Sequence, residues 1–242
     1  MWTVVKECIK EKWEVLLLAS IILIGAFLRF YNLGVKSLWF DELAEVTISQ
    51  TIIHDLSLPH LGFLQGIWWE LSPPMDYVIV HFIQIFGDSE FIVRFPAAIF
   101  GILSIIVIYY LAKELLGNVE GLISALLLAV SSMAIWYSQE ARVYSLFLLL
   151  SLISFLFLYR ASRIGNNLYW ILVTIANIAL IYTHYFGFFV LFIQGVYVFL
   201  IVLPNNSDKS GVKRISLVNK NIKNLLLFIV SSQIVLISFL PW

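Results

Sequence analysis

Long apolar runs constrain this chain more than any other feature of its sequence. A helix needs roughly 20 apolar residues to cross the hydrocarbon core of a bilayer. Runs of about that length recur through the 242 residues, of which 61% are hydrophobic and 12% charged. Soluble proteins carry about 25% charged residues. We therefore predict an all-α, polytopic membrane protein in which residues 1–242 form a single transmembrane domain.

The predicted spans are separated by short polar turns, except after the first span and before the last, where the basic loop Lys209–Lys223 lies. Arg29 lies close enough to the end of the first span for its guanidinium to snorkel to the interface. A long mixed loop, about residues 32–90, follows, in which Asp41–Leu56 and Gly62–Leu71 are predicted to be helices lying in the membrane plane. The seven predicted spans are Trp13–Tyr31, Phe91–Ala112, Val119–Tyr137, Arg142–Tyr159, Leu168–Thr183, Phe188–Leu203 and the residues from Leu225 onwards.

Basic residues indicate whether the short apolar segment Tyr77–Phe86 crosses the membrane. Counted from Met75 it has about 12 residues, or roughly 18 Å of helix, against a core of roughly 30 Å. If it does not cross, 11 of the 15 Lys and Arg residues lie on the inner side, and if it crosses only 5 do. The positive-inside rule favours the first arrangement, which puts the N-terminus in the cytoplasm. The polar residues that it places on the outer face are Asp41, Glu42, Glu70, Glu140 and His184.

Two adjacent carboxylates follow the first span, in the stretch Leu33–Glu45. Asp41 and Glu42 come directly after Trp39 and Phe40. Acidic residues at the edge of a bilayer are costly unless they are solvated, paired or functional. One interpretation is that Asp41 caps the helix that it begins and that the helix dipole favours Glu42. The other is that Asp41 is a catalytic base.

Three further polar and aromatic clusters fall on the same predicted face. Glu70 precedes Ser72–Pro74, where paired prolines stop a helix. Glu140 and Arg142 lie in a tight turn between two very apolar spans, where they either pair with each other or face a polar cavity. His184 follows the fifth span. It is either an interfacial hydrogen-bonding residue or, with Glu70, a ligand of a divalent metal ion.

The kind of substrate is narrowed by the motifs that the sequence lacks. It contains no G-x-G-x-x-G or P-loop motif for a nucleotide. A net charge of zero gives no indication of a nucleic-acid partner. Chemistry on the outer face also cannot use cytoplasmic nucleotide sugars. A donor carried on a membrane lipid fits that location.

Several ordered motifs resemble those of one enzyme family. Their order and spacing over about residues 15–200 are similar to those of the GT-C glycosyltransferases of the protein O-mannosyltransferase and aminoarabinose-transferase type. This resemblance implies a GT-C-like helix bundle with in-plane helices in a large first extracytoplasmic loop. The stretches that carry it are Leu28–Gly34, Ser37–Glu42, Ser72–Tyr77, Gly87–Pro96 and Tyr137–Tyr144.

The resemblance also implies an activity. It is an inverting transfer of a sugar from a polyprenyl-phosphate donor, dolichyl or undecaprenyl, to a hydroxyl of a glycan, lipid or protein acceptor at the cell membrane. Asp41 matches the family's acidic residue after the first helix, the general base, and Glu42 would be a supporting hydrogen-bond acceptor. Glu70 matches an acid that contacts the metal or the donor.

Phosphate binding is where this chain departs from the pattern. Some relatives carry a lysine beside the acid that Glu70 matches, and this chain has none there. Arg94 and Arg142 are then the candidates for binding the donor phosphate, and Glu140 and Tyr144 are further donor-binding candidates. A divalent metal ion, held by Glu70 and His184, is the only cofactor expected.

Two other functions stay open. A lipid-carrier-binding protein or flippase would also need an outer polar cavity, but it should expose comparable polar sites on both faces, and the inner loops here are merely basic. A non-catalytic membrane scaffold is the second alternative. The last apolar run continues to Trp242, so we expect the chain to be the N-terminal part of a longer protein.

Overall fold

A computed structural model describes residues 2–54, 73–202 and 211–240, and within these ranges all regular structure is helical. The chain divides into two compact units, residues 1–152 and 153–242. The single transmembrane domain stays a prediction. The helices are α1 (Trp2–Phe30), α2 (Phe40–His54), α4 (Met75–Gln84), α5 (Glu90–Leu115), α6 (Asn118–Val130), α7 (Ser132–Ser138), α8 (Tyr144–Ile164), α9 (Asn167–Thr183), α10 (Gly187–Val202) and α11 (Gly211–Phe239).

Four of the described helices are long and apolar enough to cross a membrane, which confirms the polytopic helical class. They contain the segments Lys12–Phe30, Glu90–Leu115, Tyr144–Ile164 and Asn219–Phe239. The helices α9 and α10 are also apolar but shorter. The predicted span Val119–Tyr137 is not one straight helix, because the chain breaks at Ser131 and bends by 60° between α6 and α7, which together form either a broken span or a re-entrant loop. Ser131 is extended, and its hydroxyl oxygen accepts a hydrogen bond from Ala134 N at 3.4 Å, which caps the new helix.

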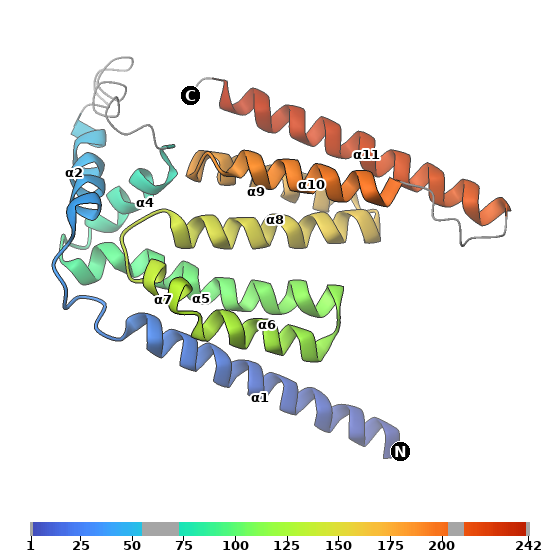
Figure 1. Cartoon of the computed structure of the whole chain (residues 1–242), viewed down its shortest axis with the longest axis horizontal. Coiled ribbons are helices and arrows are strands. Elements are labelled where there is room, and N and C mark those ends of the chain that lie inside the picture. The colour runs from blue at the N-terminus through green and yellow to red at the C-terminus, as the bar shows by residue number, and fades with distance from the viewer. Residues whose placement is uncertain (1, 55–72, 203–210, 241–242) are drawn as a thin grey trace. The chain divides into compact units, whose positions relative to one another are not determined.

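Helix α5 forms the centre of the first unit and packs against α1 and α6 (Figure 1). The buried side chains at this contact include Ile21 on α1, Ile105 on α5 and Ala129 on α6. Small residues bring the helices close together. A Cβ atom added at Gly121 would lie only 2.9 Å from the backbone oxygen of Tyr109. Close approach of this kind provides the packing that holds helices together in lipid.

A polar cluster ties the same three helices together at the end that is predicted to face the cytoplasm. The buried Glu14 carboxylate accepts hydrogen bonds from Tyr109 Oη, from Lys113 Nζ at 2.5 Å and from Asn118 Nδ2 at 2.7 Å. Ionisable groups among apolar helices are stable only when paired. The cluster therefore holds the start of α6 and the end of α5 to α1.

Arg29 does not snorkel, contrary to the sequence-based expectation, because its side chain is fully buried. Its Nη1 donates to Gly25 O and Ala129 O, each at 3.1 Å, and its Nη2 donates to Leu128 O at 3.1 Å. The last two carbonyls lie at the end of α6, where the break at Ser131 leaves them without intrahelical partners. Arg29 thus satisfies the carbonyl groups that the break exposes.

The loop between α1 and α5 begins and ends at the same end of the helix bundle. The rings of Phe30 and Phe91 lie 6.4 Å apart. Helix α2 runs across the direction of α1 and α5 at this end (Figure 1), as predicted for an in-plane helix. Helix α4 has ten residues, or about 15 Å, so it is too short to cross a core of roughly 30 Å. The second predicted in-plane helix, Gly62–Leu71, lies outside the described residues.

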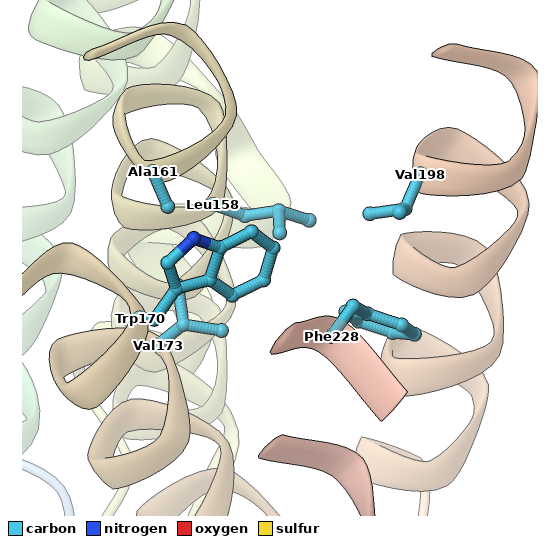
Figure 2. Packing of buried hydrophobic residues seen from close by; sticks show 6 residues of the cluster. All are labelled: Leu158, Ala161, Trp170, Val173, Val198 and Phe228. Atoms are coloured by element: carbon cyan, nitrogen blue, oxygen red, sulfur yellow. The ribbon is translucent and has the colours of Figure 1, made fainter. Parts of the chain in front are cut away.

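The second unit has an apolar cluster and a buried polar one. Figure 2 shows Trp170 of α9 beside Leu158 and Ala161 of α8, with Val198 and Phe228 completing the cluster. Farther along the helices, buried polar residues bond across them. Asn177 Nδ2 donates to Gln194 Oε1 at 2.8 Å, and Gln194 Nε2 donates to Ser154 Oγ at 2.9 Å. Hydrogen bonds of this kind hold membrane helices together without disturbing their apolar surface.

Candidate active site

Glu42 anchors the start of α2, because both of its carboxylate oxygens are bound inside the protein. Its side chain is 0% exposed. Oε1 accepts from Arg94 Nε at 2.8 Å and from Ala141 N at 2.7 Å, while Oε2 accepts from Arg94 Nη2 at 2.6 Å. Oε2 also accepts from Trp39 N at 3.3 Å, which is the bond that a Glu in the first helical turn makes to the residue before the helix.

Arg94 has all five of its N–H groups engaged within the chain. Besides the two bonds to Glu42, Nη1 donates to Leu33 O at 3.0 Å and to Lys36 O at 2.7 Å, and Nη2 donates to Ser37 O at 3.2 Å. A guanidinium has five donors, so none remains for a ligand in this structure. Arg94 was predicted to bind the donor phosphate, which stays a prediction, and in this structure its bonds hold the loop before α2.

Asp41 is partly exposed to solvent, whereas its neighbour Glu42 is buried. The Asp41 side chain is 38% exposed, and its Oδ2 lies 4.0 Å from Arg142 Nη2. Arg142 Nη1 donates to Asp41 O at 3.4 Å and to Glu45 Oε2 at 3.1 Å. Of the two adjacent acids, Asp41 alone is therefore accessible to a substrate. Helix α2 begins at Phe40, so Asp41 lies in its first turn.

Arg142 lies among three acids, only one of which is exposed. Glu45 is 2% exposed, and Asp76, in the first turn of α4, is 7% exposed. Burial raises the pKa of Asp76 to about 7, although the charge of Arg142 lowers it. Asp76 Oδ2 has no hydrogen-bond partner among the described residues. Arg142 was predicted to bind phosphate, which stays a prediction, and in this structure it is the cation between Asp41 and Glu45.

A pocket of about 900 Å³ opens beside α2. Aromatic side chains form much of its wall, and the rings of Tyr137 and Tyr144 lie 4.5 Å apart within it. Its ionisable side chains include Glu42, Arg94, Glu140 and Lys36. Aromatic faces and a few converging polar groups are typical of sites for small polar ligands. Asp41 does not line this pocket, but its neighbours in the sequence Trp39 and Glu42 do.

Lys36 is a candidate that the sequence analysis missed. It is exposed, it lines the pocket, and its Nζ lies 5.6 Å from the centre of the Trp136 ring. An ammonium group over an indole face is held by cation–π attraction and keeps its donors available. Its position five residues before Asp41, in the same short loop, was the available signal. The contact with Trp136, one hundred residues away, could not be predicted from that position in the sequence.

Glu140 and Tyr144, both predicted to bind the donor, line the pocket. Burial raises the pKa of Glu140, as does the charge of Glu42, while a hydrogen bond with the Trp136 side chain lowers it. The turn that carries Glu140 is held against the end of α1. Gln139 Nε2 donates to Leu28 O at 3.0 Å and to Tyr31 O at 2.9 Å, which are carbonyls at the end of α1.

Only one of the two predicted metal ligands, His184, is among the described residues. Glu70 lies outside the described residues. His184 follows the last residue of α9, in the second unit, and its Nδ1 accepts a hydrogen bond from Phe186 N at 3.1 Å. Among the described residues no group of three or more His, Cys, Asp or Glu side chains is placed to hold a metal ion. The metal therefore stays a prediction.

The fold and this site together define a polytopic membrane protein with a polar, aromatic pocket beside a carboxylate-rich loop. The chain belongs to the dolichyl-phosphate-mannose-protein mannosyltransferase family, whose family model matches residues 71–242. This confirms the resemblance inferred from the ordered motifs. The matched residues begin after Asp41 and Glu42, so the match does not reach the two acids. A search of curated proteins gives no match.

Membership in this family establishes the general class of activity. The chain is a membrane glycosyltransferase of a family that uses polyprenyl-phosphate-linked sugar donors. We treat four finer points as proposals. They are the contribution of single residues, the acceptor, the stereochemistry of the transfer and the side of the membrane on which it occurs.

Proposed function

We propose that this protein transfers a sugar, with inversion, from a polyprenyl phosphate to an acceptor hydroxyl on the extracytoplasmic face, and that Asp41 is the general base. The observation that carries the proposal is the contrast between two adjacent acids. Glu42 is buried and bound on both oxygens, while Asp41 is 38% exposed. A base must reach the proton that it removes, and of these two carboxylates Asp41 is the one that can.

The reaction needs one proton acceptor and one displacement. Asp41 takes the proton of the acceptor hydroxyl as the hydroxyl oxygen forms a bond to the anomeric carbon of the donor. The bond between that carbon and the phosphate oxygen breaks, and the electron pair leaves with the polyprenyl phosphate. Arg142, 4.0 Å from Asp41 Oδ2, orients the carboxylate. The role that the sequence suggested for Glu42 becomes a positioning one, because it holds Arg94 and the start of α2.

Lys36 is the group that we propose for the phosphate. It is exposed in the pocket, whereas the N–H groups of Arg94 are all bound to the chain. A lysine acts on phosphate as a point charge and lowers the energy of the leaving group as its negative charge grows. The sugar ring would lie against the aromatic wall near Trp136, with Glu140 and Tyr144 as hydrogen-bonding groups.

A transfer assay in membranes with radiolabelled polyprenyl-phosphate sugars tests the proposal on the full-length protein. Asp41→Asn keeps the shape of the side chain but removes the base, so transfer should fall by a factor of about 100 or more. The thermal unfolding midpoint should not change, because Asp41 is partly exposed. Glu42→Gln should instead lower that midpoint, since it leaves Arg94 without its buried counter-charge, at about 3–5 kcal/mol.

Control variants distinguish loss of the catalytic base from loss of any negative charge in the loop. Asp88→Asn, an exposed acid in the same loop, should transfer normally. Lys36→Gln should raise the donor concentration needed for half-maximal rate. A chelator added to the same assay tests the predicted divalent ion. Normal turnover of Asp41→Asn would reject Asp41 as the base, and transbilayer movement of the donor without transfer would favour the flippase.

A further inference from the structure

Another pocket lies in the second unit, between the turn that joins α8 to α9 and the neighbouring stretch of α11. It encloses about 470 Å³ and is lined by residues of the α8–α9 turn and of one stretch of α11. Its polar lining consists of Trp170, Asn219, Lys220, Lys223 and Asn224. No carboxylate is among its lining residues. The pocket therefore offers hydrogen-bond donors and positive charge, the combination that binds phosphate.

The donors of this pocket are only partly used by the protein. Lys220 and Lys223 are exposed. Lys220 Nζ donates to Arg163 O at 2.8 Å, which engages one of the three N–H groups of an ammonium. The buried Asn224 donates from Nδ2 to Ser162 O at 3.2 Å. The backbone contacts of Lys220 and Asn224 fix this part of α11 against the end of α8.

Trp170 supplies an observation that surface lysines alone would not. The residue is 4% exposed, and its indole Nε1 is buried with no hydrogen-bond partner among the described residues. Figure 2 shows the ring packed beside α8 with its nitrogen turned toward Ala161. Ala161 lies one turn before Ile164, which lines the pocket together with Trp170. A buried donor without a partner is unfavourable, and an acceptor atom of a ligand would satisfy it once the side chains that cover the nitrogen shift.

The surroundings of the pocket distinguish a lipid from a free ion. Two apolar side chains, Ile164 and Leu227, line the pocket, and Ile164 is 61% exposed. In a membrane-spanning helix such side chains face acyl chains. A headgroup bound by the lysines would therefore have its chains beside an apolar surface. The positive-inside rule accounts for the basic residues here, but not for a pocket beside a buried, unpartnered indole N–H.

We propose that this pocket binds the phosphate headgroup of an anionic membrane phospholipid. Lys220 and Lys223 would neutralise the phosphate, and Trp170 Nε1 would donate to one of its oxygens or to a headgroup oxygen. Basic pockets between membrane helices bind anionic lipid headgroups in this way. The proposal rests on the membrane class of the protein and is independent of the proposed catalytic roles.

Native mass spectrometry of the full chain in neutral detergent tests it, with phosphatidylglycerol, phosphatidylcholine and inorganic phosphate as separate probes. We expect phosphatidylglycerol to be retained, and the double variant Lys220→Gln/Lys223→Gln to retain it roughly 10-fold less. Lys12→Gln, which removes an exposed lysine of the first unit, should retain it normally. Phosphatidylcholine should not be retained, and inorganic phosphate should not displace the lipid.

A second variant provides a test that still holds if the double lysine variant fails to fold. Trp170→Phe keeps an aromatic ring in the core and removes only the indole N–H. Phosphatidylglycerol should raise the thermal unfolding midpoint of the unaltered protein more than that of this variant. Equal retention of the two lipids, or unchanged phosphatidylglycerol retention in the double lysine variant, would overturn the proposal. Displacement by inorganic phosphate would do so as well, because it would make the site one for a free anion.

Discussion

At the scale of single residues, neighbouring side chains near α2 have very different surroundings. Asp41 is partly exposed beside Arg142, Glu42 is enclosed by Arg94, and Glu45 is buried against Arg142. Helical spacing accounts for part of this, because residues three apart share a face and adjacent residues do not. The exposed acid is suited to react and the enclosed acid to hold the helix in place.

Asp76 predicts a pH dependence of stability. Its folded-state pKa of about 7 lies above the ordinary 3.8, so the folded protein keeps a proton that the unfolded chain has released. Stability is therefore lost as the pH rises from about 4 to about 7. Between about pH 5 and about pH 8 the loss should be about 2–3 kcal/mol, seen as a lower thermal unfolding midpoint.

The variant Asp76→Asn identifies the source of this slope. Asn carries no titratable proton, so its unfolding midpoint should change less with pH than that of the unaltered protein. Asp88→Asn, at an exposed position, should retain the full slope. A variant Asp76→Asn with the original pH profile would show that other carboxyl groups cause it, Glu140 foremost, because burial also raises its pKa.

At the scale of elements, the break between α6 and α7 shapes the pocket wall. Arg29 of α1 donates to the exposed carbonyls at the end of α6, and Gln139, just after α7, donates to carbonyls at the end of α1. Each helix end is thus satisfied by a side chain from the other segment. This reciprocal capping fixes α7 and the following turn, which carries Glu140, against α1.

Gly101 of α5 is expected to be essential for this arrangement. A Cβ atom there would lie 2.1 Å from Ser138 Oγ and 2.7 Å from Arg29 Nε. Gly101→Ala should therefore push α7 and Arg29 away from α5 and destabilise the protein by about 1–3 kcal/mol. Thermal unfolding measures the change.

Gly195 in α10 is the matched control. A Cβ atom there would lie 3.4 Å from Phe228 Cε1, an ordinary contact. Gly195→Ala should leave the midpoint unchanged or raise it by up to about 1 kcal/mol of stability, because Ala favours a helix more than Gly does. Equal responses of the two variants would contradict the close approach at Gly101.

At the scale of the whole molecule, the orientation in the membrane stays a prediction from charge. With 11 of the 15 basic residues on the inner side, the loop that carries Asp41 faces outward. Val35 is 74% exposed in that loop. Asn167 is exposed at the start of α9, next to the α8–α9 turn that the same rule places inside.

Single cysteines test this orientation in a Cys8→Ser background. A membrane-impermeant thiol reagent should label Val35→Cys in intact cells. It should label Asn167→Cys only after permeabilisation, because the α8–α9 turn would face the cytoplasm. Labelling of both positions from outside would contradict the charge argument, and the opposite pattern would put the proposed chemistry on the inner face.

The sequence by itself determined the class of protein and most of its helices, because apolar length is a local property of the chain. It also identified α4 as too short to cross. Two features of the structure could not be predicted without non-local information. The bend at Ser131 and the burial of Arg29 depend on each other, and the residues involved are about one hundred positions apart.

Only the tertiary structure decided which residues of the loop are accessible. Asp41 and Glu42 are adjacent acids, and their roles separate only because Arg94, 52 residues after Glu42, encloses one of them. That contact and three bonds to loop carbonyls engage every N–H group of Arg94. Lys36 is positioned by its contact with the ring of Trp136. Burial and pairing depend on which distant segments meet, and the local pattern of a sequence does not record that.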